Sequence, residues 1–316
     1  MVIKNYLSLI KFSHTIFALP FAVIGFFLGL YKGEFGVAAW ILDRNNVPAH
    51  GNTYLIFSNS HFVYRDVIVF KFILVILCMV FARSAAMAFN RYLDRNFDAK
   101  NPRTALREIP AGVLSATGTL WFTIICSLLF MACTAFINWL CFLLSPVALF
   151  VILGYSYTKR FTPLCHLILG LGLSLAPIGA YLAVTEHFDI IPVIFSFTVL
   201  TWVSGFDIIY ALQDEEFDRS QKLYSIPAAV GKTNALRISQ ALHLSSIIFV
   251  FLAGLYGAFG WLYWIGVAFF AGMLIYQHSI VKPNDLKRVN LAFMTANGIA
   301  SVVFAVFVVS DILLHF

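Results

Sequence analysis

The sequence has 316 residues, of which 61% are hydrophobic and only 11% are charged, and its net charge at pH 7 is +6. Soluble domains carry about 25% charged residues, so this composition excludes an ordinary soluble enzyme and indicates an integral membrane protein. The five cysteines are scattered through apolar runs and form no CxxC pair, which is typical of packing residues rather than of a metal site or a disulfide framework. We expect no nucleic-acid partner.

Nine apolar segments are candidates for membrane-spanning helices, each of which needs about 20 mostly apolar residues. They cover residues 12–31, 67–89, 115–137, 140–157, 164–184, 190–213, 235–259, 261–280 and 291–313. We therefore predict an all-α polytopic membrane protein with nine transmembrane helices, forming a single domain over residues 1–316. The segment 32–66 is long for an outer loop, and we assign it no catalytic role.

The basic residues are distributed unevenly between the two ends of the predicted spans. The N-terminal segment and the loops after the second, fourth, sixth and eighth spans carry most of the 21 Lys and Arg residues. The opposite loops have only Lys32, Arg44 and Arg65. Cytoplasmic loops are enriched in Lys and Arg, so we expect a protein of the bacterial inner or plasma membrane type with its N-terminus in the cytoplasm and its C-terminus outside.

The second span runs into a polar stretch, NRYLDRNFDAKNPRT, at residues 90–104. Asn90, Asp94 and Asp98 are spaced four residues apart, which places all three side chains on one face of a helix. Two carboxylates at that spacing repel each other and destabilise the helix unless a cation lies between them. The spacing therefore indicates a cation site at the cytoplasmic end of this span.

A second copy of the pattern follows the sixth span. Residues 213–218 read QDEEFD and match residues 93–98, which read LDRNFD, and the tripeptide Ile-Pro-Ala follows each copy, at residues 109–111 and 226–228. Both copies follow an even-numbered span and are four spans apart. We predict a parallel internal repeat of two four-helix units, with the ninth helix added at the end.

Two carboxylate sets on the same side of a membrane favour a site for Mg²⁺ and a diphosphate, because Mg²⁺ binds carboxylates, waters and substrate phosphates in octahedral geometry. The predicted metal ligands are Asn90, Asp94, Asp98, Asp214 and Asp218. The predicted diphosphate-binding residues are the nearby Lys100, Arg103, Lys159, Arg160 and Lys222. A solvated, charged helix end without metal is the alternative for the carboxylates, and for each basic residue a role in topology alone remains open.

Three further polar residues lie deeper in the predicted spans. Asp207 and Tyr210 extend the stripe of the second carboxylate set inward along the sixth span, and Arg83 lies seven residues before Asn90 on the same face of the second span. A charge at the bilayer centre costs about 2.5–3.5 kcal/mol on insertion scales. We therefore expect Arg83 and Asp207 to face a polar cavity as candidate catalytic residues with Tyr210, although an Arg–Asp pair that only joins two helices is an alternative.

With these residues identified, the chain resembles the UbiA superfamily of membrane prenyltransferases over nearly its whole length. Members of that superfamily carry NxxxDxxxD after the second helix and DxxxD after the sixth, on a nine-helix bundle. Asn90, Asp94 and Asp98 fit the first motif, Asp214 and Asp218 the second, and Arg83, Asp207 and Tyr210 the conserved residues that precede them. Residues 155–160, YSYTKR, are similar to the Y-x-x-x-K-R segment of the family. The residues in and around these motifs most resemble those of the 4-hydroxybenzoate polyprenyltransferase-like subgroup.

The resemblance implies an Mg²⁺-dependent enzyme that transfers a polyprenyl group from a polyprenyl diphosphate, within the lipid bilayer, to a small aromatic acceptor such as 4-hydroxybenzoate for quinone synthesis. One departure concerns residues 103–110, RTALREIP, where the family often has R-T-x-x-R-P-L. This leaves the acceptor open, and a dihydroxynaphthoate-type acceptor of the futalosine route to menaquinone is the alternative. A different class, an ion-coupled secondary transporter, would place its charged residues near the membrane midplane instead.

Overall fold

The structure is a computed structural model, and it describes residues 6, 8–9, 17–32 and 62–314. Within these residues the secondary structure is helical, apart from an isolated antiparallel bridge between Lys282 and Asp285. The prediction of an all-α protein is confirmed for this part of the chain. The long outer segment lies almost entirely outside the described residues.

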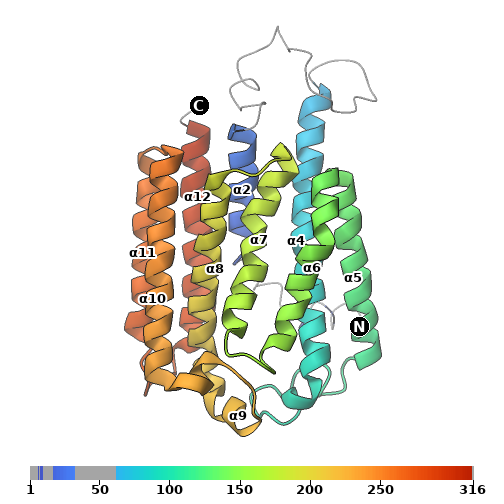
Figure 1. Cartoon of the computed structure of the whole chain (residues 1–316), viewed down its shortest axis with the longest axis vertical. Coiled ribbons are helices and arrows are strands. Elements are labelled where there is room, and N and C mark those ends of the chain that lie inside the picture. Colours follow the sequence, from blue (N-terminus) through green and yellow to red (C-terminus); the bar gives the residue numbers. More distant parts are fainter. Residues whose placement is uncertain (1–5, 7, 10–16, 33–61, 315–316) are drawn as a thin grey trace.

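The helices stand side by side in one bundle, and the short α9 lies at one end of it (Figure 1). The main helices are α2 (Leu19–Lys32), α4 (Phe62–Asp98), α5 (Ala116–Ile137), α6 (Trp139–Thr158), α7 (Cys165–Thr185), α8 (Ile190–Ala211), α9 (Glu215–Ser220), α10 (Ile226–Gly257), α11 (Trp261–Ile280) and α12 (Asn297–Leu314). Two short elements complete the description, the 3₁₀ turn η2 (Leu212–Asp214) and the π-helical turn η3 (Leu291–Ala296).

Seven helical segments of the described chain are long and apolar enough to cross a membrane. They are Asp66–Asp98, Ala116–Ile137, Trp139–Thr158, Cys165–Thr185, Ile190–Ser220, Ile226–Gly257 and Leu291–Leu314. The first and eighth predicted spans are not among them. The described part of the first is a short apolar helix, Leu19–Tyr31, and α11 contains Trp, Tyr, Gln and His residues that lower its mean hydropathy. The number of nine spans therefore stays a prediction.

The two largest hydrophobic clusters of the described chain share α2 and α7. One core lies among α2, α7, α8, α10, α11 and α12 and contains the fully buried Phe21, Trp202 and Phe304. The other lies among α2, α4, α5, α6 and α7. The backbones of α2 and α7 approach so closely that a Cβ atom on Gly25 would lie 2.0 Å from the carbonyl oxygen of Pro177. A glycine at this position is what permits the close packing of the two shared helices.

The polar connections after α4, α6 and α9 gather at the end of the bundle that carries α9, whereas α12 and the turn between α7 and α8 end at the opposite side (Figure 1). Two local features set the geometry there. The first motif is fully helical, because α4 continues nine residues beyond the predicted span end at residue 89 and ends at Asp98. The second motif is not on one continuous α-helix, since η2 interrupts the predicted stripe between α8 and α9.

Candidate active site

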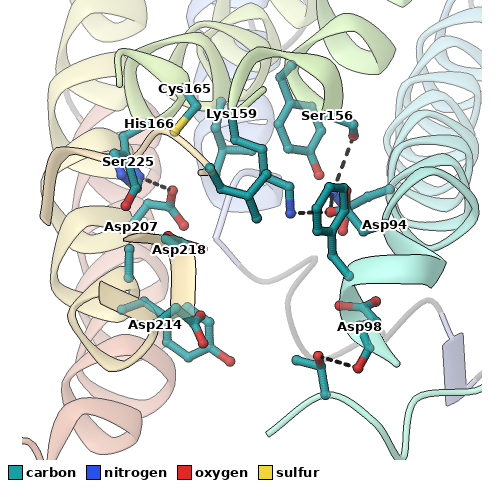
Figure 2. Close-up of a pocket in the computed structure, with 18 of the residues that line it drawn as sticks. Asp94, Asp98, Ser156, Lys159, Cys165, His166, Asp207, Asp214, Asp218 and Ser225 are labelled. Carbon is teal, nitrogen blue, oxygen red and sulfur yellow. Dashed lines mark hydrogen bonds and ion pairs between the residues drawn. The ribbon is translucent and has the colours of Figure 1, made fainter. Parts of the chain in front are cut away.

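A polar cavity of about 250 Å³ lies at the end of the bundle where the two motifs meet. Asp94 and Asp98 project from one side of it, and Asp207, Asp214 and Asp218 project from the other (Figure 2). The predicted site residues that line the cavity are Arg83, Asn90, Asp94, Asp98, Arg103, Lys159, Asp207, Tyr210, Asp214 and Asp218. The fold thus brings together two motifs that lie more than 100 residues apart in the chain.

Three predicted diphosphate-binding residues do not line this cavity. Arg160 still belongs to the site, because it donates a hydrogen bond of 3.2 Å to Asp94 Oδ1. Lys100, two residues after α4, and Lys222, two residues after α9, are both exposed at the same end of the bundle. Their role in phosphate binding stays a prediction.

The first motif is held by basic side chains from the end of α6. Asn90 Nδ2 donates to Asp94 Oδ2 over 3.1 Å, and the amide also lies 3.5 Å from Ser156 Oγ. The carboxylate of Asp94 is almost fully buried, with Lys159 Nζ 2.5 Å from its Oδ2 and Arg160 on its other oxygen. The YSYTKR segment thus supplies the positive charge that the first motif faces.

The connection after α4 supplies the basic partners of Asp98 and Asp214. Arg107 Nη1 lies 2.7 Å from Asp98 Oδ1, whereas the buried Asp98 Oδ2 has no hydrogen-bond partner among the described residues. Arg103 crosses to the second motif, where it forms a bidentate pair with Asp214, and its Nη1 donates to the Tyr210 hydroxyl over 2.8 Å. Burial alone would lower the pKa of Arg103. The hydrogen bonds from Arg103 to Asp214 and the negative charge of Asp214 outweigh this effect and raise the pKa above its ordinary value.

The donor chemistry of the two motifs fits Mg²⁺, because the set offers one amide and four carboxylate side chains and therefore only hard oxygen ligands. The unpartnered Asp98 Oδ2 is one oxygen that a cation would satisfy. As the side chains lie in this structure, however, no group of three or more His, Cys, Asp and Glu side chains in the described chain is close enough to hold a metal ion. Instead, Lys and Arg side chains pair with Asp94, Asp98 and Asp214, whereas Asp218 has no ion pair among the described residues.

Deeper in the cavity, Asp207 contacts His166, which lies outside both motifs and is not among the predicted site residues. His166 Nδ1 lies 2.7 Å from Asp207 Oδ2, and His166 Nε2 accepts a hydrogen bond of 3.4 Å from the backbone N–H of Ile226. The neutral tautomer compatible with both contacts carries its proton on Nδ1 and donates it to Asp207. The sequence could have indicated His166 as a candidate site residue, because it is an ionisable residue at the start of an apolar span.

Arg83 has no ion pair with Asp207 among the described residues, so a pair that only joins two helices is not what the structure contains. Its Nε atom is buried without a hydrogen-bond partner in the described chain. Arg83 and Tyr155 line the polar cavity and also a second, apolar cavity of about 360 Å³ that lies mainly among α4, α5, α6 and α7. The two cavities therefore meet at Arg83.

Aromatic rings form the wall of the polar cavity on the side of α8 and α12. Tyr210 stacks on Phe293 with ring centroids 4.2 Å apart, and Phe293 meets Phe206 and Phe17 edge to face, each at 5.4 Å. The guanidinium of Arg103 lies 5.0 Å from the centroid of the Tyr210 ring. The site therefore combines carboxylates and bases at its mouth with a His–Asp hydrogen bond, an arginine Nε that has no partner in the described chain, and aromatic faces inside.

Comparison with known proteins agrees with this arrangement. Residues 60–299 match the UbiA prenyltransferase family. A 4-hydroxybenzoate octaprenyltransferase from Francisella tularensis subsp. tularensis is 27% identical over 238 residues, which cover 75% of this chain and 82% of that protein. The apo structure of a UbiA homolog from Aeropyrum pernix K1 superposes with a TM-score of 0.73 at 27% identity, covering 96% of this chain and 98% of that one.

A UbiA homolog from Archaeoglobus fulgidus, solved bound to DMAPP and Mg²⁺, has the same fold, with a TM-score of 0.67 at 20% identity over 98% of this chain and 99% of that one. The family match extends over well more than half of the sequence and includes both carboxylate motifs. The chain therefore belongs to the UbiA prenyltransferase family.

Proposed function

We propose that this protein transfers a polyprenyl group from a polyprenyl diphosphate to 4-hydroxybenzoate or a similar small aromatic acceptor in quinone biosynthesis. The observation that carries the proposal is that three features meet at one place. They are a mouth of carboxylates and bases, an apolar cavity, and between them Arg83, whose Nε has no hydrogen-bond partner among the described residues. The name of the Francisella relative supports this acceptor, and the DMAPP and Mg²⁺ bound by the Archaeoglobus homolog support this class of donor.

The mouth of the cavity would bind the diphosphate. Mg²⁺ would be held by Asn90, Asp94, Asp98, Asp214 and Asp218, and would supply positive charge to the leaving diphosphate. Arg103, Lys159 and Arg160 now neutralise these carboxylates, so their charges can transfer to phosphate oxygens when the donor binds. Lys100 and Lys222, exposed at the same end, are assigned to the outer phosphate oxygens.

The apolar cavity would hold the polyprenyl tail. It begins at Arg83 and Tyr155, where it meets the polar cavity, and its other lining residues are almost all apolar. Burial of hydrocarbon stabilises binding by roughly 0.8 kcal/mol per CH₂ group, so a tail in this cavity contributes binding energy without contacting the reacting carbon. The tail would then leave its first carbon at the junction of the two cavities, beside Arg83.

The acceptor would lie between Arg83 and Asp207. The buried Nε of Arg83, which has no partner among the described residues, would bind the acceptor carboxylate. Asp207, oriented by His166, would accept a proton from the acceptor. In the reaction, the C–O bond of the donor breaks and its electron pair leaves with the diphosphate. A ring carbon of the acceptor forms the new C–C bond, and the ring proton passes to Asp207. The faces of Tyr210 and Phe293 stabilise the allylic cation formed in between.

A dihydroxynaphthoate-type acceptor remains the second candidate, because it offers Arg83 the same carboxylate on a larger ring. Ion-coupled transport is not supported, since the carboxylate motifs lie at one end of the bundle and the family is one of prenyltransferases. We further propose that residues 1–316 form one domain with nine spans in two four-helix repeats plus a ninth helix. The site would lie on the cytoplasmic side of a bacterial inner membrane, and the C-terminus would lie on the outer side.

The test uses purified full-length protein in detergent with a labelled polyprenyl diphosphate and both aromatic acids as acceptors. We expect EDTA to abolish transfer and Mg²⁺ to restore it. Asp94→Ala and Asp214→Ala should each lower the rate with every acceptor by on the order of 10²–10³. Glu216→Ala removes an acid of α9 that is 91% exposed, and this control should leave the rate unchanged.

The same purified protein also tests whether the carboxylate motifs bind the donor while Arg83 and Asp207 bind the acceptor. Arg83→Gln and Asp207→Asn should raise the KM for the acceptor, or change the preferred acceptor, while donor binding is kept. Full turnover after EDTA treatment would refute the metal assignment. Loss of donor binding in the Arg83 and Asp207 variants, as severe as in the motif variants, would refute the acceptor assignment.

A further inference from the structure

A buried polar cluster lies in the bundle interior beside the aromatic wall, and Asn297 is at its centre. The side chain of Asn297 is fully buried. Its Oδ1 accepts hydrogen bonds from Trp202 Nε1 at 2.9 Å and from Gln277 Nε2 at 2.7 Å. Its Nδ2 donates to the carbonyl oxygens of Ala292 and Phe293, at 3.1 and 3.0 Å. All the donors and acceptors of this amide have partners, so its orientation is fixed from α8 and α11.

The two carbonyls that receive the Nδ2 protons belong to the π-helical turn η3. The backbone N–H of Asn297 donates to the carbonyl of Met294 and not to that of Phe293, which would be its partner in a regular α-helix. The side-chain amide of Asn297 donates to the carbonyl of Phe293 instead. The amide therefore stabilises this turn directly, and π-helical turns of this kind occur frequently at functional sites.

The turn determines where the ring of Phe293 lies. Each residue of an α-helix rotates about 100° from the last, so reverting the π turn to regular α-helix would rotate Phe293 away from its present direction. In that direction it lines the polar cavity and stacks on Tyr210. Tyr210 in turn accepts a hydrogen bond from Arg103, which holds Asp214 of the second motif.

We infer that Asn297 is a positioning residue of the active site: through the π turn it fixes Phe293 against Tyr210, and so forms the aromatic face that shields the reacting allylic carbon from water. The inference rests on the proposed function and adds a residue that does not line the cavity. If the ring moves away, water can reach the carbocation. A C–O bond from water then forms at the first carbon of the donor in place of the C–C bond to the acceptor, the water proton passes to solvent, and prenyl alcohol is released with diphosphate.

The test measures the ratio of prenyl alcohol to prenylated acceptor, with geranyl diphosphate and 4-hydroxybenzoate as substrates. Asn297→Leu removes the amide and Phe293→Leu removes the ring, and each should raise this ratio at least about fivefold. Both products form from one cation, and a change of about 1 kcal/mol in the exclusion of water shifts their partition by about that factor. Combining the two should raise it no further than the larger single effect, because both act through the same ring. Ser246→Ala is the matched control. It removes another fully buried hydrogen bond between α10 and α8, to the carbonyl of Thr198, away from the cavity.

A loss of packing alone would lower the yield of folded protein without changing the product ratio. If Asn297→Leu does not fold, Gln277→Met removes one of the two hydrogen bonds to Asn297 Oδ1 at similar side-chain volume, and should still raise the ratio. The inference is overturned if the ratio of prenyl alcohol to prenylated acceptor is unchanged in folded Asn297→Leu, or in Gln277→Met where only that variant folds. Fully additive effects of Asn297→Leu and Phe293→Leu on this ratio overturn it as well. Failure of the wild-type protein to prenylate any aromatic acceptor would refute the proposed function itself.

Discussion

The contact between His166 and Asp207 leads to a quantitative prediction about acceptor kinetics. His166→Leu removes the donor that orients the Asp207 carboxylate, while the apolar side chain still fills the start of α7. His166 is 4% exposed and Asp207 is 22% exposed, so water has limited access to replace the lost hydrogen bond. A hydrogen bond to a charged group contributes about 1.5–3 kcal/mol.

At about 1.4 kcal/mol per factor of ten, that loss corresponds to a decrease of roughly 10- to 150-fold in kcat/KM for the aromatic acceptor. Because Asp207 remains partly exposed, we expect the lower half of this range. His166→Gln is the matched variant, since its amide can still donate a hydrogen bond to a carboxylate and should recover much of the loss. The assay varies the acceptor concentration at saturating donor in purified protein and measures donor binding separately.

Two results would contradict this reasoning. If His166→Leu keeps kcat/KM for the acceptor within about twofold of wild type, the hydrogen bond to Asp207 does not contribute to the reaction. If donor affinity falls as much as acceptor kcat/KM, the effect passes through Ile226 and the start of α10, where His166 Nε2 accepts its other hydrogen bond. In that case His166 supports the start of α10 rather than Asp207.

Two further predictions concern stability and topology. Asp311 is 1% exposed and accepts hydrogen bonds from the backbone N–H groups of Gly260 and Tyr263. Asp311→Ala should therefore destabilise the protein at the start of α11 by about 2 kcal/mol and lower the Tm by several degrees. An unchanged Tm would show that Asp311 does not cap this helix. Single cysteines at Lys100 and Ser220 should be labelled by a membrane-impermeant thiol reagent from the same side, and one at His187 from the other; opposite labelling of the first two would refute the shared site.

The extent of several helices could be read from the apolar runs alone. The predicted spans 115–137, 164–184 and 261–280 agree with α5, α7 and α11 to within one residue at each end. Two helices are longer than predicted, and α4 continues through the polar residues 90–98. The helix α10 begins at Ile226, nine residues before the predicted span, since Ser225 caps its first turn and Gly231, at φ 80°, allows a kink before the apolar part.

The spacing of the carboxylates also predicted which residues would meet, since Asn90, Asp94 and Asp98 and the second pair face one cavity. A four-residue period determines a helix face whatever surrounds it, and the duplicated motif indicated two such faces at the same end of the bundle.

The partners of those residues were decided only by the tertiary structure. Arg103 reaches Asp214 across 111 residues, and His166 reaches Asp207 across 41. Helical periodicity fixes which face a side chain occupies but not which helix packs against that face. The π turn at Phe293 likewise depends on contacts from other helices, such as the hydrogen bonds from Trp202 and Gln277 to Asn297. The sequence by itself therefore determined the membrane helices and the carboxylate faces, whereas the packing of the bundle decided which bases, histidine and aromatic rings those faces meet.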